Sequence, residues 1–395
     1  MQILDDIWIK FAVWLRGLFD SFLPQWASQL VMDFLGILLL IIIGIVVVLA
    51  FTWMERKVIA RVGDRYGPNR AGPLGVFQAL ADALKMLTKE DVMPTNADKW
   101  LFIAAPIIII IPAVLLYAVL PFGRGMVGVD LSIGVVFIVA MGAIPVLSML
   151  MAGWGSNNKY ALMGGFRAVN QLLAYEIPMV IALLTVVLLA GTMSTVGIVE
   201  AQSSFPFILV TPVAFIIYFL AGLAELGRTP FDLLEADSEI VAGYFIEYSG
   251  MNFALFFLAE FINLFMVAGM ITTLFLGGWQ WPILPSWLWF LIKTVGVIFL
   301  IMWIRSTFPR LRVDQLLGFS WKTLVPLALV NLFIVALVAK LVDPGWIRTI
   351  ILLGSNIALL AAALLIMGRQ FRKREAKAKA AGEAAIKRYY ASSSN

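Results

Sequence analysis

Carboxylates gathered in one short polar segment are the residues best suited to chemistry in this sequence. Residues 225–250 contain six carboxylates and a single basic residue, Arg228. Three of them, Asp232, Glu235 and Glu239, fall at positions i, i+3 and i+7, so a helix would place them on one face, where like charges repel. If little water reaches that face, some of these groups keep their protons and their titrations are coupled. The segment therefore indicates proton transfer, and the alternative is an acidic loop in water. The six carboxylates are Glu225, Asp232, Glu235, Asp237, Glu239 and Glu247.

Three further ionisable residues interrupt or adjoin stretches that are otherwise apolar. Glu260 lies inside one such stretch, Glu176 stands at the start of another, and Lys293 lies within a third. A charged group at membrane depth is costly and by default marks a proton or ion path. The alternative is that Glu260 and Lys293 form an ion pair that only holds helices together.

A second polar segment, residues 54–99, is rich in basic residues. It opens with Glu55-Arg56-Lys57, whose two cations are also explained by anchoring of a helix end at the membrane surface. Farther along, apolar and polar side chains alternate with helical spacing, which predicts an amphipathic helix. Its apolar face would carry Phe77, Leu80, Leu84 and Leu87, and its polar face Gln78, Asp82, Lys85 and Lys89.

The composition excludes several classes of active site. The sequence contains no cysteine and no histidine. Disulfides, thiolate iron–sulfur sites, histidine zinc sites, axial-histidine haem and Ser-His or Cys-His catalysis are therefore excluded. Any metal, flavin or iron–sulfur cluster used in a redox reaction is expected in a partner protein.

Apolar stretches that must position these groups run through most of the chain. Hydrophobic residues make up 62% of the 395 residues, charged residues make up 13%, and the mean hydropathy is +0.96. About 20 apolar residues suffice for a helix to cross a bilayer, and nine stretches come near that length. These expected spans cover 34–54, 100–123, 131–158, 177–199, 201–224, 251–276, 287–304, 323–339 and 349–368.

The basic residues predict how these spans are oriented. Of the 29 lysines and arginines, 23 lie in five segments that would share one side of the membrane, and this side is expected to be the cytoplasm. The N-terminus is then outside and the C-terminus is inside. The expected fold is an all-α polytopic transmembrane helix bundle of about nine spans. Its parts are an outer-face amphipathic helix (1–29), a core of eight spans (30–342) with cytoplasmic loops 54–99, 153–176, 225–250 and 305–322, an extra ninth span (343–368) and a basic cytoplasmic tail (369–395).

Several motifs in the polar loops resemble one known family. They are Met54-Glu-Arg-Lys57, Asp64-Arg-Tyr-Gly-Pro-Asn-Arg70, Lys89-Glu-Asp91, Ala152-Gly-Trp-Gly-Ser-Asn-Asn-Lys-Tyr160, Arg228-Thr-Pro-Phe-Asp232, Glu247-Tyr-Ser-Gly-Met251, Gly277-Gly-Trp-Gln280 and Pro309-Arg-Leu-Arg-Val-Asp-Gln315. In this order they resemble the quinone-site membrane subunit of bacterial proton-pumping NADH:quinone oxidoreductase, or respiratory complex I. Two positions depart from the family pattern. Leu234 replaces a frequent proline, and Phe245 replaces a polar residue, which counts against a proton hand-off there.

The resemblance implies a part in a multi-subunit translocase in the cell membrane. Its quinone substrate, ubiquinone or menaquinone, would enter a tunnel formed with soluble iron–sulfur subunits that dock on the cytoplasmic loops. Other membrane subunits of the pumping arm and membrane lipid would be further partners, and nucleic acid would not. By matched position, the tunnel residues are Arg56, Arg61, Arg167, Arg228 and Phe231. The implied proton path contains Glu176, Glu225, Asp232, Glu235, Asp237, Glu239, Glu247 and Glu260, and we add Lys293 to it.

Other functions are open at this point. A homologous subunit of a ferredoxin-, F420- or hydrogenase-linked membrane complex would share most of these motifs, although the intact 65–70 run favours the NADH-linked form. A stand-alone transporter would require inverted repeats and paired broken helices, and we find neither pattern. A purely structural anchor would leave the acidic cluster and Glu260 without a purpose.

Overall fold

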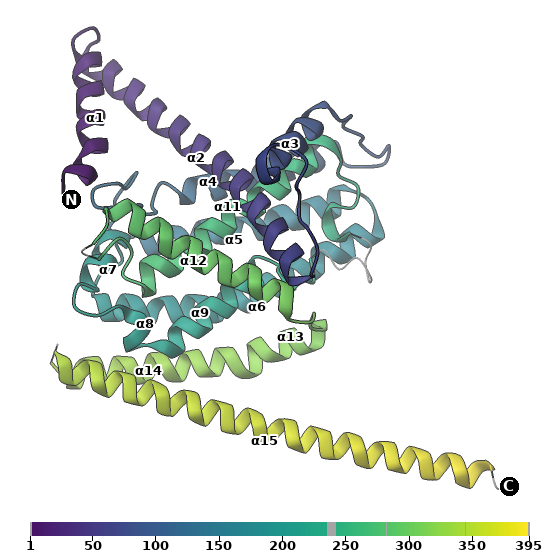
Figure 1. Cartoon of the computed structure of the whole chain (residues 1–395). Helices are drawn as coiled ribbons and strands as arrows, with labels where there is room; N and C mark the ends of the chain where they lie inside the picture. The colour runs from purple at the N-terminus through teal and green to yellow at the C-terminus, as the bar shows by residue number, and fades with distance from the viewer. Residues whose placement is uncertain (1, 235–241, 282, 344, 394–395) are drawn as a thin grey trace.

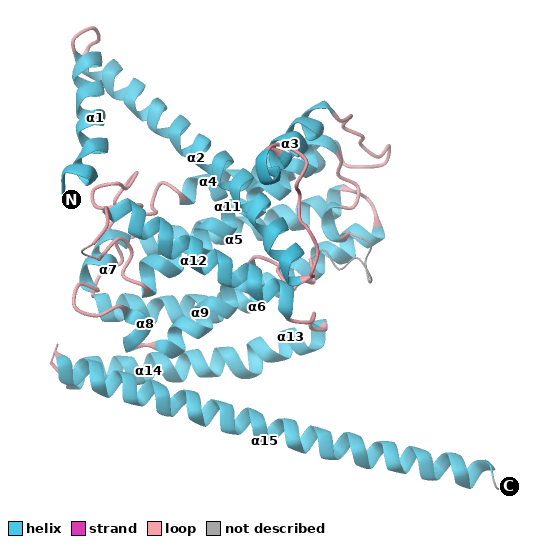
Figure 2. Cartoon of the chain, in the orientation of Figure 1, coloured by secondary structure: helices cyan, strands magenta, loops and turns pink. Residues whose placement is uncertain are grey.

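The chain folds into helices joined by loops. The computed structural model describes residues 2–234, 242–281, 283–343 and 345–393, with the side chains of residues 10–369 among them. Within these residues every named element is a helix, and no strand is formed (Figure 2). This confirms the predicted all-α fold.

Eight helices in the described part of the chain are long and apolar enough to cross a membrane. In a bilayer each helix pairs its own backbone N–H and C=O groups, because lipid tails offer them no hydrogen-bond partners. They confirm a multi-pass membrane protein (Figure 1). The helices are α2 (Gln25–Val62), α4 (Lys99–Leu116), α5 (Gly134–Gly155), α6 (Lys159–Ala190), α11 (Gly250–Phe275), α12 (Ser286–Thr307), the continuous run of α13 (Val313–Phe319), η3 (Ser320–Leu324) and α14 (Val325–Leu341), and the apolar part of α15 (Trp346–Ser393).

The single continuous helix expected at 201–224 is wrong, although this segment still passes across the bundle, from Gln202 bonded to Gly277 at the C-terminal end of α11 to Arg228 paired with Glu260 in its N-terminal half. The structure divides this region into α7 (Thr195–Ala201), α8 (Phe207–Val210) and α9 (Pro212–Glu225). Pro206 directly precedes α8 and Pro212 begins α9, and proline has no N–H to continue a preceding helix. The 14 residues of α9 rise only about 21 Å, less than the ~30 Å of a hydrocarbon core. This helix is instead enclosed by protein, because it packs against α6, α11, α14 and α15.

A buried glutamine satisfies the backbone where this span is interrupted. The Oε1 atom of Gln202 accepts hydrogen bonds from the backbone N–H groups of Phe207 at 3.2 Å and Gly277 at 3.0 Å. Its Nε2 atom donates to the carbonyl of Thr273 at 2.8 Å. One side chain therefore replaces bonds that a continuous helix would have made, and it ties the break to the end of α11.

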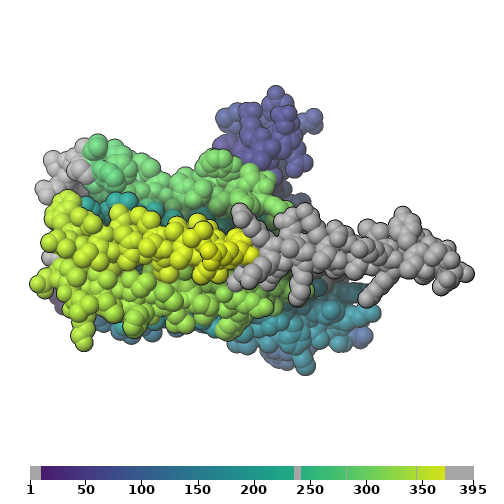
Figure 3. All heavy atoms as spheres, turned by 90° about the horizontal axis from the view of Figure 1, so that it is seen from below, coloured from purple at the N-terminus to yellow at the C-terminus, as the bar shows by residue number. Residues whose placement is uncertain are grey.

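The two ends of the chain lie at opposite ends of the molecule (Figure 1). Helix α1 (Gln2–Asp20) and the first half of α2 lean away from the bundle, joined by a hydrogen bond from Arg16 to Gln29 at 3.1 Å. Helix α15 lies along α14 on the face seen in Figure 3. Which end faces the cytoplasm stays a prediction.

Helices α6 and α11 position the polar groups described next. Helix α6 packs against α5, α9 and α14, and α11 packs against α2, α4 and α12. Two short elements complete this end of the bundle, namely α3 (Gln78–Thr88) beside α2 and α11, and η2 (Gly243–Phe245) beside α6. The predicted amphipathic helix at 77–89 is therefore confirmed as α3.

Candidate functional site

A buried network of two arginines and two glutamates joins four parts of the fold. Arg228, which is 1% exposed, follows α9 and forms ion pairs with Glu55 of α2 and with Glu260 of α11, the latter at 3.1 Å. Glu55 also pairs with Arg305 of α12. The four formal charges cancel. This balance is important because a buried charge without a partner strongly destabilises the folded protein. The guanidinium of Arg228 also lies 4.9 Å from the ring centre of Phe261.

The loop that carries Arg228 is fixed by hydrogen bonds to its backbone. Gln171 of α6 is fully buried, and its Nε2 atom donates to the carbonyls of Ala224 at 2.7 Å and Phe231 at 2.6 Å. The Phe231 ring is 2% exposed and packs against Tyr175, with ring centres 5.2 Å apart. The structure thus brings Arg228 and Phe231 together, and it buries both inside this chain.

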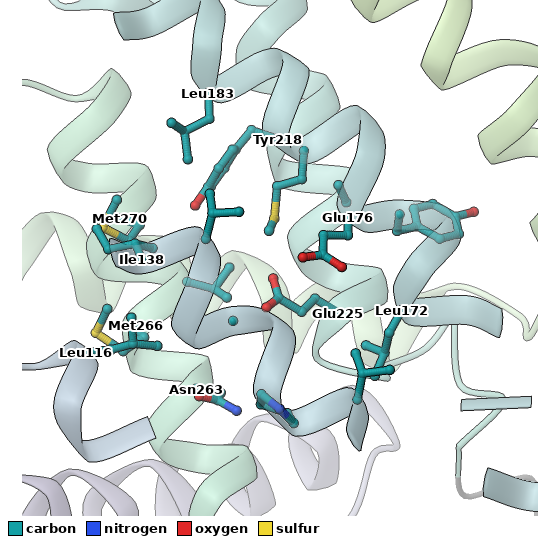
Figure 4. A pocket seen from close by; sticks show the side chains of 18 of the residues that line it. Leu116, Ile138, Leu172, Glu176, Leu183, Tyr218, Glu225, Asn263, Met266 and Met270 are labelled. Carbon is teal, nitrogen blue, oxygen red and sulfur yellow. The ribbon is translucent and has the colours of Figure 1, made fainter. Parts of the chain in front are cut away.

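Two of the predicted carboxylates face one another across a cavity of about 70 Å³. Glu176 comes from α6 and Glu225 from the last residue of α9, and their carboxyl groups point toward each other (Figure 4). Tyr218 and Asn263 also line this cavity. Within the described residues, neither Glu176 nor Glu225 forms an ion pair or a hydrogen bond through its carboxylate.

A second, smaller cavity continues from the first toward the arginine network. It has a volume of about 50 Å³, and Glu225 and Asn263 line it as well as the first cavity. Glu260 and Arg305 of the arginine network also line it. The predicted carboxylates Glu176, Glu225 and Glu260 are therefore brought together along two adjoining cavities. The two positions that depart from the family pattern, Leu234 and Phe245, also line the second cavity.

Arg56 lies outside this buried network, at the edge of an apolar cavity. Its guanidinium pairs with Asp82 of α3 at 2.5 Å. Between α2, α3 and α11 is a cavity of about 410 Å³ with apolar walls, and these two residues are among its few charged groups. Ile45, Val48, Leu49, Leu255, Phe257 and Leu258 form much of its wall.

The other predicted residues lie at the margins of the site. Arg61 is exposed, and its guanidinium is 5.9 Å from the ring centre of Tyr66. Glu247 accepts a hydrogen bond from Asn158 at 2.6 Å. Arg167 on α6 and Asp232 after α9 are both partly buried. Glu235, Asp237 and Glu239 lie outside the described residues.

Lys293 is not brought together with the carboxylates. Its ammonium group donates to the carbonyls of Leu276 at 2.8 Å, Gly278 at 2.9 Å and Gln280 at 3.0 Å. These carbonyls follow the C-terminal end of α11, and Leu276 is about 24 Å along the chain from Glu260 at 1.5 Å per residue. The alternative ion pair between Glu260 and Lys293 is therefore wrong, because Glu260 pairs with Arg228.

Four residues of the site were not predicted from the sequence. Glu55 and Arg305 stand at helix ends, where a charge is usually explained by membrane anchoring, and Gln171 and Asn263 are neutral. A signal existed for Glu55, because it falls four and seven residues after Phe51 and Val48, on the buried face of α2. The other three carry no comparable signal.

Comparison with known proteins gives the family. The sequence model of the NADH dehydrogenase family matches residues 35–336. The H-type subunit of NADH-quinone oxidoreductase from Dehalococcoides mccartyi (strain CBDB1) is 48% identical over 336 residues, which are 85% of this chain and 94% of the relative. The H-type subunit from Carboxydothermus hydrogenoformans is 50% identical, covering 75% and 88% of the two chains, and that from Geobacillus thermodenitrificans is 45% identical, covering 80% and 97%. The chain therefore belongs to the NADH dehydrogenase family and, within it, to the H-type subunits of NADH-quinone oxidoreductase.

Proposed function

We propose that this chain forms part of the quinone site of its complex and couples quinone reduction to proton translocation through buried carboxylates. The observation that carries the proposal is the row of Glu176, Glu225 and Glu260 along two adjoining cavities. Glu260, at one end of this row, forms a charge-balanced network with Glu55 and the two arginines Arg228 and Arg305. A redox reaction near such a network changes the local charge, and carboxylates respond by changing their proton occupancy.

The apolar cavity between α2, α3 and α11 suits the tail of a quinone. A quinone has a long apolar tail and a small polar head, and sites for such ligands are apolar with a few convergent polar groups. The cavity of about 410 Å³ meets this description, with Arg56 and Asp82 at its polar edge. Arg228 and Phe231 are buried and do not line this cavity, so their part is to hold the loop and the electrostatic environment in place.

Sharing of Arg228 between two carboxylates provides the coupling step. Reduction of a quinone by two electrons creates negative charge that is neutralised by two protons. Negative charge developing on the side of Glu55 draws the guanidinium groups toward itself and weakens the hold of Arg228 on Glu260. Glu260 then takes up a proton, and the carboxylates beyond it receive or release protons in turn. Electron transfer and proton movement are thus linked by one change in charge balance.

The charge distribution and the polar loops support an orientation in the membrane and a set of partner subunits. We place the N-terminus outside and the basic C-terminal tail in the cytoplasm, on the side that collects 23 of 29 basic residues. Soluble iron–sulfur subunits, which bring electrons from NADH, dock on the cytoplasmic loops. The change in protonation of the carboxylates is passed on to the other membrane subunits of the pumping arm.

Glutamine variants of the three carboxylates test the proposal. Glutamine keeps the shape of glutamate but cannot release a proton. In membranes containing the whole complex, E176Q, E225Q and E260Q should each lower quinone-linked NADH oxidation and proton pumping together, while transfer to a hydrophilic artificial acceptor persists. The exposed Glu200, in the same chain but outside both cavities, gives the control E200Q, which should retain both activities. Full turnover and full pumping in all three variants would refute the proton path.

A further inference from the structure

Asn263 stands where the two carboxylate cavities meet. It lies on α11 three residues after Glu260, so the two side chains are about one helical turn apart. Three residues line both cavities, namely Glu225, Asn263 and the apolar Met149. Asn263 is thus the neutral polar group at the junction, and Figure 4 shows it on the opposite side of Glu225 from Tyr218.

The amide of Asn263 is available to molecules in these cavities. Within the described residues, it forms no hydrogen bond to another side chain or to the backbone. A carboxamide carries two N–H donors and a carbonyl acceptor, so it can donate to a carboxylate and accept from a water molecule at the same time. A water molecule in a liquid takes up about 30 Å³, and buried waters are held by two to four polar partners. Cavities of about 70 and 50 Å³ with carboxylates in their walls meet both conditions.

We propose that Asn263 is a positioning residue that orders water across the junction and so connects Glu260 to Glu225 and Glu176. This inference rests on the proposed proton path and names the group that keeps it continuous. The proton passes from a protonated carboxyl to an ordered water, while that water gives a proton to the next carboxylate. Asn263 itself gains and loses no proton, because its amide only fixes the direction in which the waters donate.

The test replaces Asn263 with leucine, which has a similar size and no polar group. In the whole complex, quinone-linked NADH oxidation of N263L should fall about tenfold. This is less than the roughly 10²-fold that loss of a proton-transferring group itself causes, because a less ordered water can still cross the junction. The solvent deuterium isotope effect on this activity should rise, since proton transfer becomes the slow step. Transfer to an artificial acceptor should persist.

Two controls separate ordering of water from packing. Leu264 is the next residue along α11 and is buried but lines neither cavity, so L264M changes the packing beside Asn263 without removing a polar group and should keep full turnover. N263S keeps a donor and an acceptor, and it should recover at least half of the activity that N263L loses. If N263L does not assemble, N263A, which adds no bulk, takes its place with the same expectation.

The outcomes distinguish failure of the role of Asn263 from failure of the proton path itself. If E225Q and E260Q lose turnover while N263L retains it with an unchanged isotope effect, the role of Asn263 is refuted and the proton path stands. An N263S variant as slow as N263L also refutes it. If E225Q and E260Q retain full turnover, the proton path fails and the role of Asn263 fails with it.

Discussion

Replacing Arg228 with methionine tests whether the buried network acts as one electrostatic unit. Arg228 is 1% exposed and joins Glu55 to Glu260, so its loss leaves two carboxylates with a single arginine, Arg305. Leaving a buried charge without its partner typically costs about 3–5 kcal/mol. Glu260 is 26% exposed, so we expect the lower end, about 3 kcal/mol. At about 2 °C per kcal/mol, Tm should fall by about 6 °C.

A second substitution separates charge balance from function. Adding E260Q to R228M restores one carboxylate to one arginine, the pair formed by Glu55 and Arg305. The double variant should regain most of the lost stability but none of the quinone-linked turnover, because Glu260 can no longer exchange a proton. Melting of the purified complex is followed by tryptophan fluorescence, with R124M, at an exposed arginine, as the control. The expected fall in Tm for R228M is about 6 °C. A Tm of R228M within about 2 °C of the parent would refute the reasoning, and so would a double variant R228M/E260Q that is no more stable than R228M.

Four further predictions concern the placement of single residues. Because the chain has no cysteine, one cysteine at exposed Ser204 should react with an impermeant maleimide only from outside the cell, and one at exposed Asn69 only from inside; the reverse pattern overturns the orientation. R56A should slow quinone reduction and weaken the binding of quinone-site inhibitors at an unchanged Tm. F231A should lower the unfolding free energy by about 3–5 kcal/mol because the Phe231 ring is buried, and equal Tm values for F231A and R56A would contradict this. K293M should lower stability by about 1–3 kcal/mol by leaving carbonyls without a donor. It should leave turnover per assembled complex unchanged, and loss of turnover without loss of stability would place Lys293 on the proton path.

The membrane helices could be predicted from the sequence because lipid imposes a simple requirement on composition. The stretch 251–276, for example, became α11 with nearly the same ends, Gly250–Phe275, although it contains a glutamate. The stretch 201–224 is equally apolar, yet it forms short helices enclosed by protein. Apolar composition does not distinguish a residue that faces lipid from one that faces other helices. Pro206 and Pro212 were the local signals for the break, but proline is also tolerated inside membrane helices, as Pro145 is in α5.

The site could be predicted by residue type but not by partnership. Glu260 was singled out because a carboxylate in an apolar stretch is costly. The choice between Lys293 and Arg228 as its partner depends on which helix ends meet, and this is fixed by the packing of α2, α11 and α12 rather than by local sequence. Glu55 was hidden for a related reason. It stands beside Arg56 at the end of a span, and only its burial against α12 distinguishes it from an anchoring residue.

The surroundings of the four glutamates divide their roles. Glu55 is held by two arginines and is nearly inaccessible, so its negative charge is permanently compensated. Glu176 and Glu225 face each other without a cation among the described residues, so their like charges repel and their protonation states are coupled. Glu260 belongs to both environments, because it pairs with Arg228 and lines the cavity that leads to Glu225. It is therefore the residue whose proton occupancy depends on where Arg228 is drawn, and for this reason the charge-balanced double variant should restore stability without restoring function.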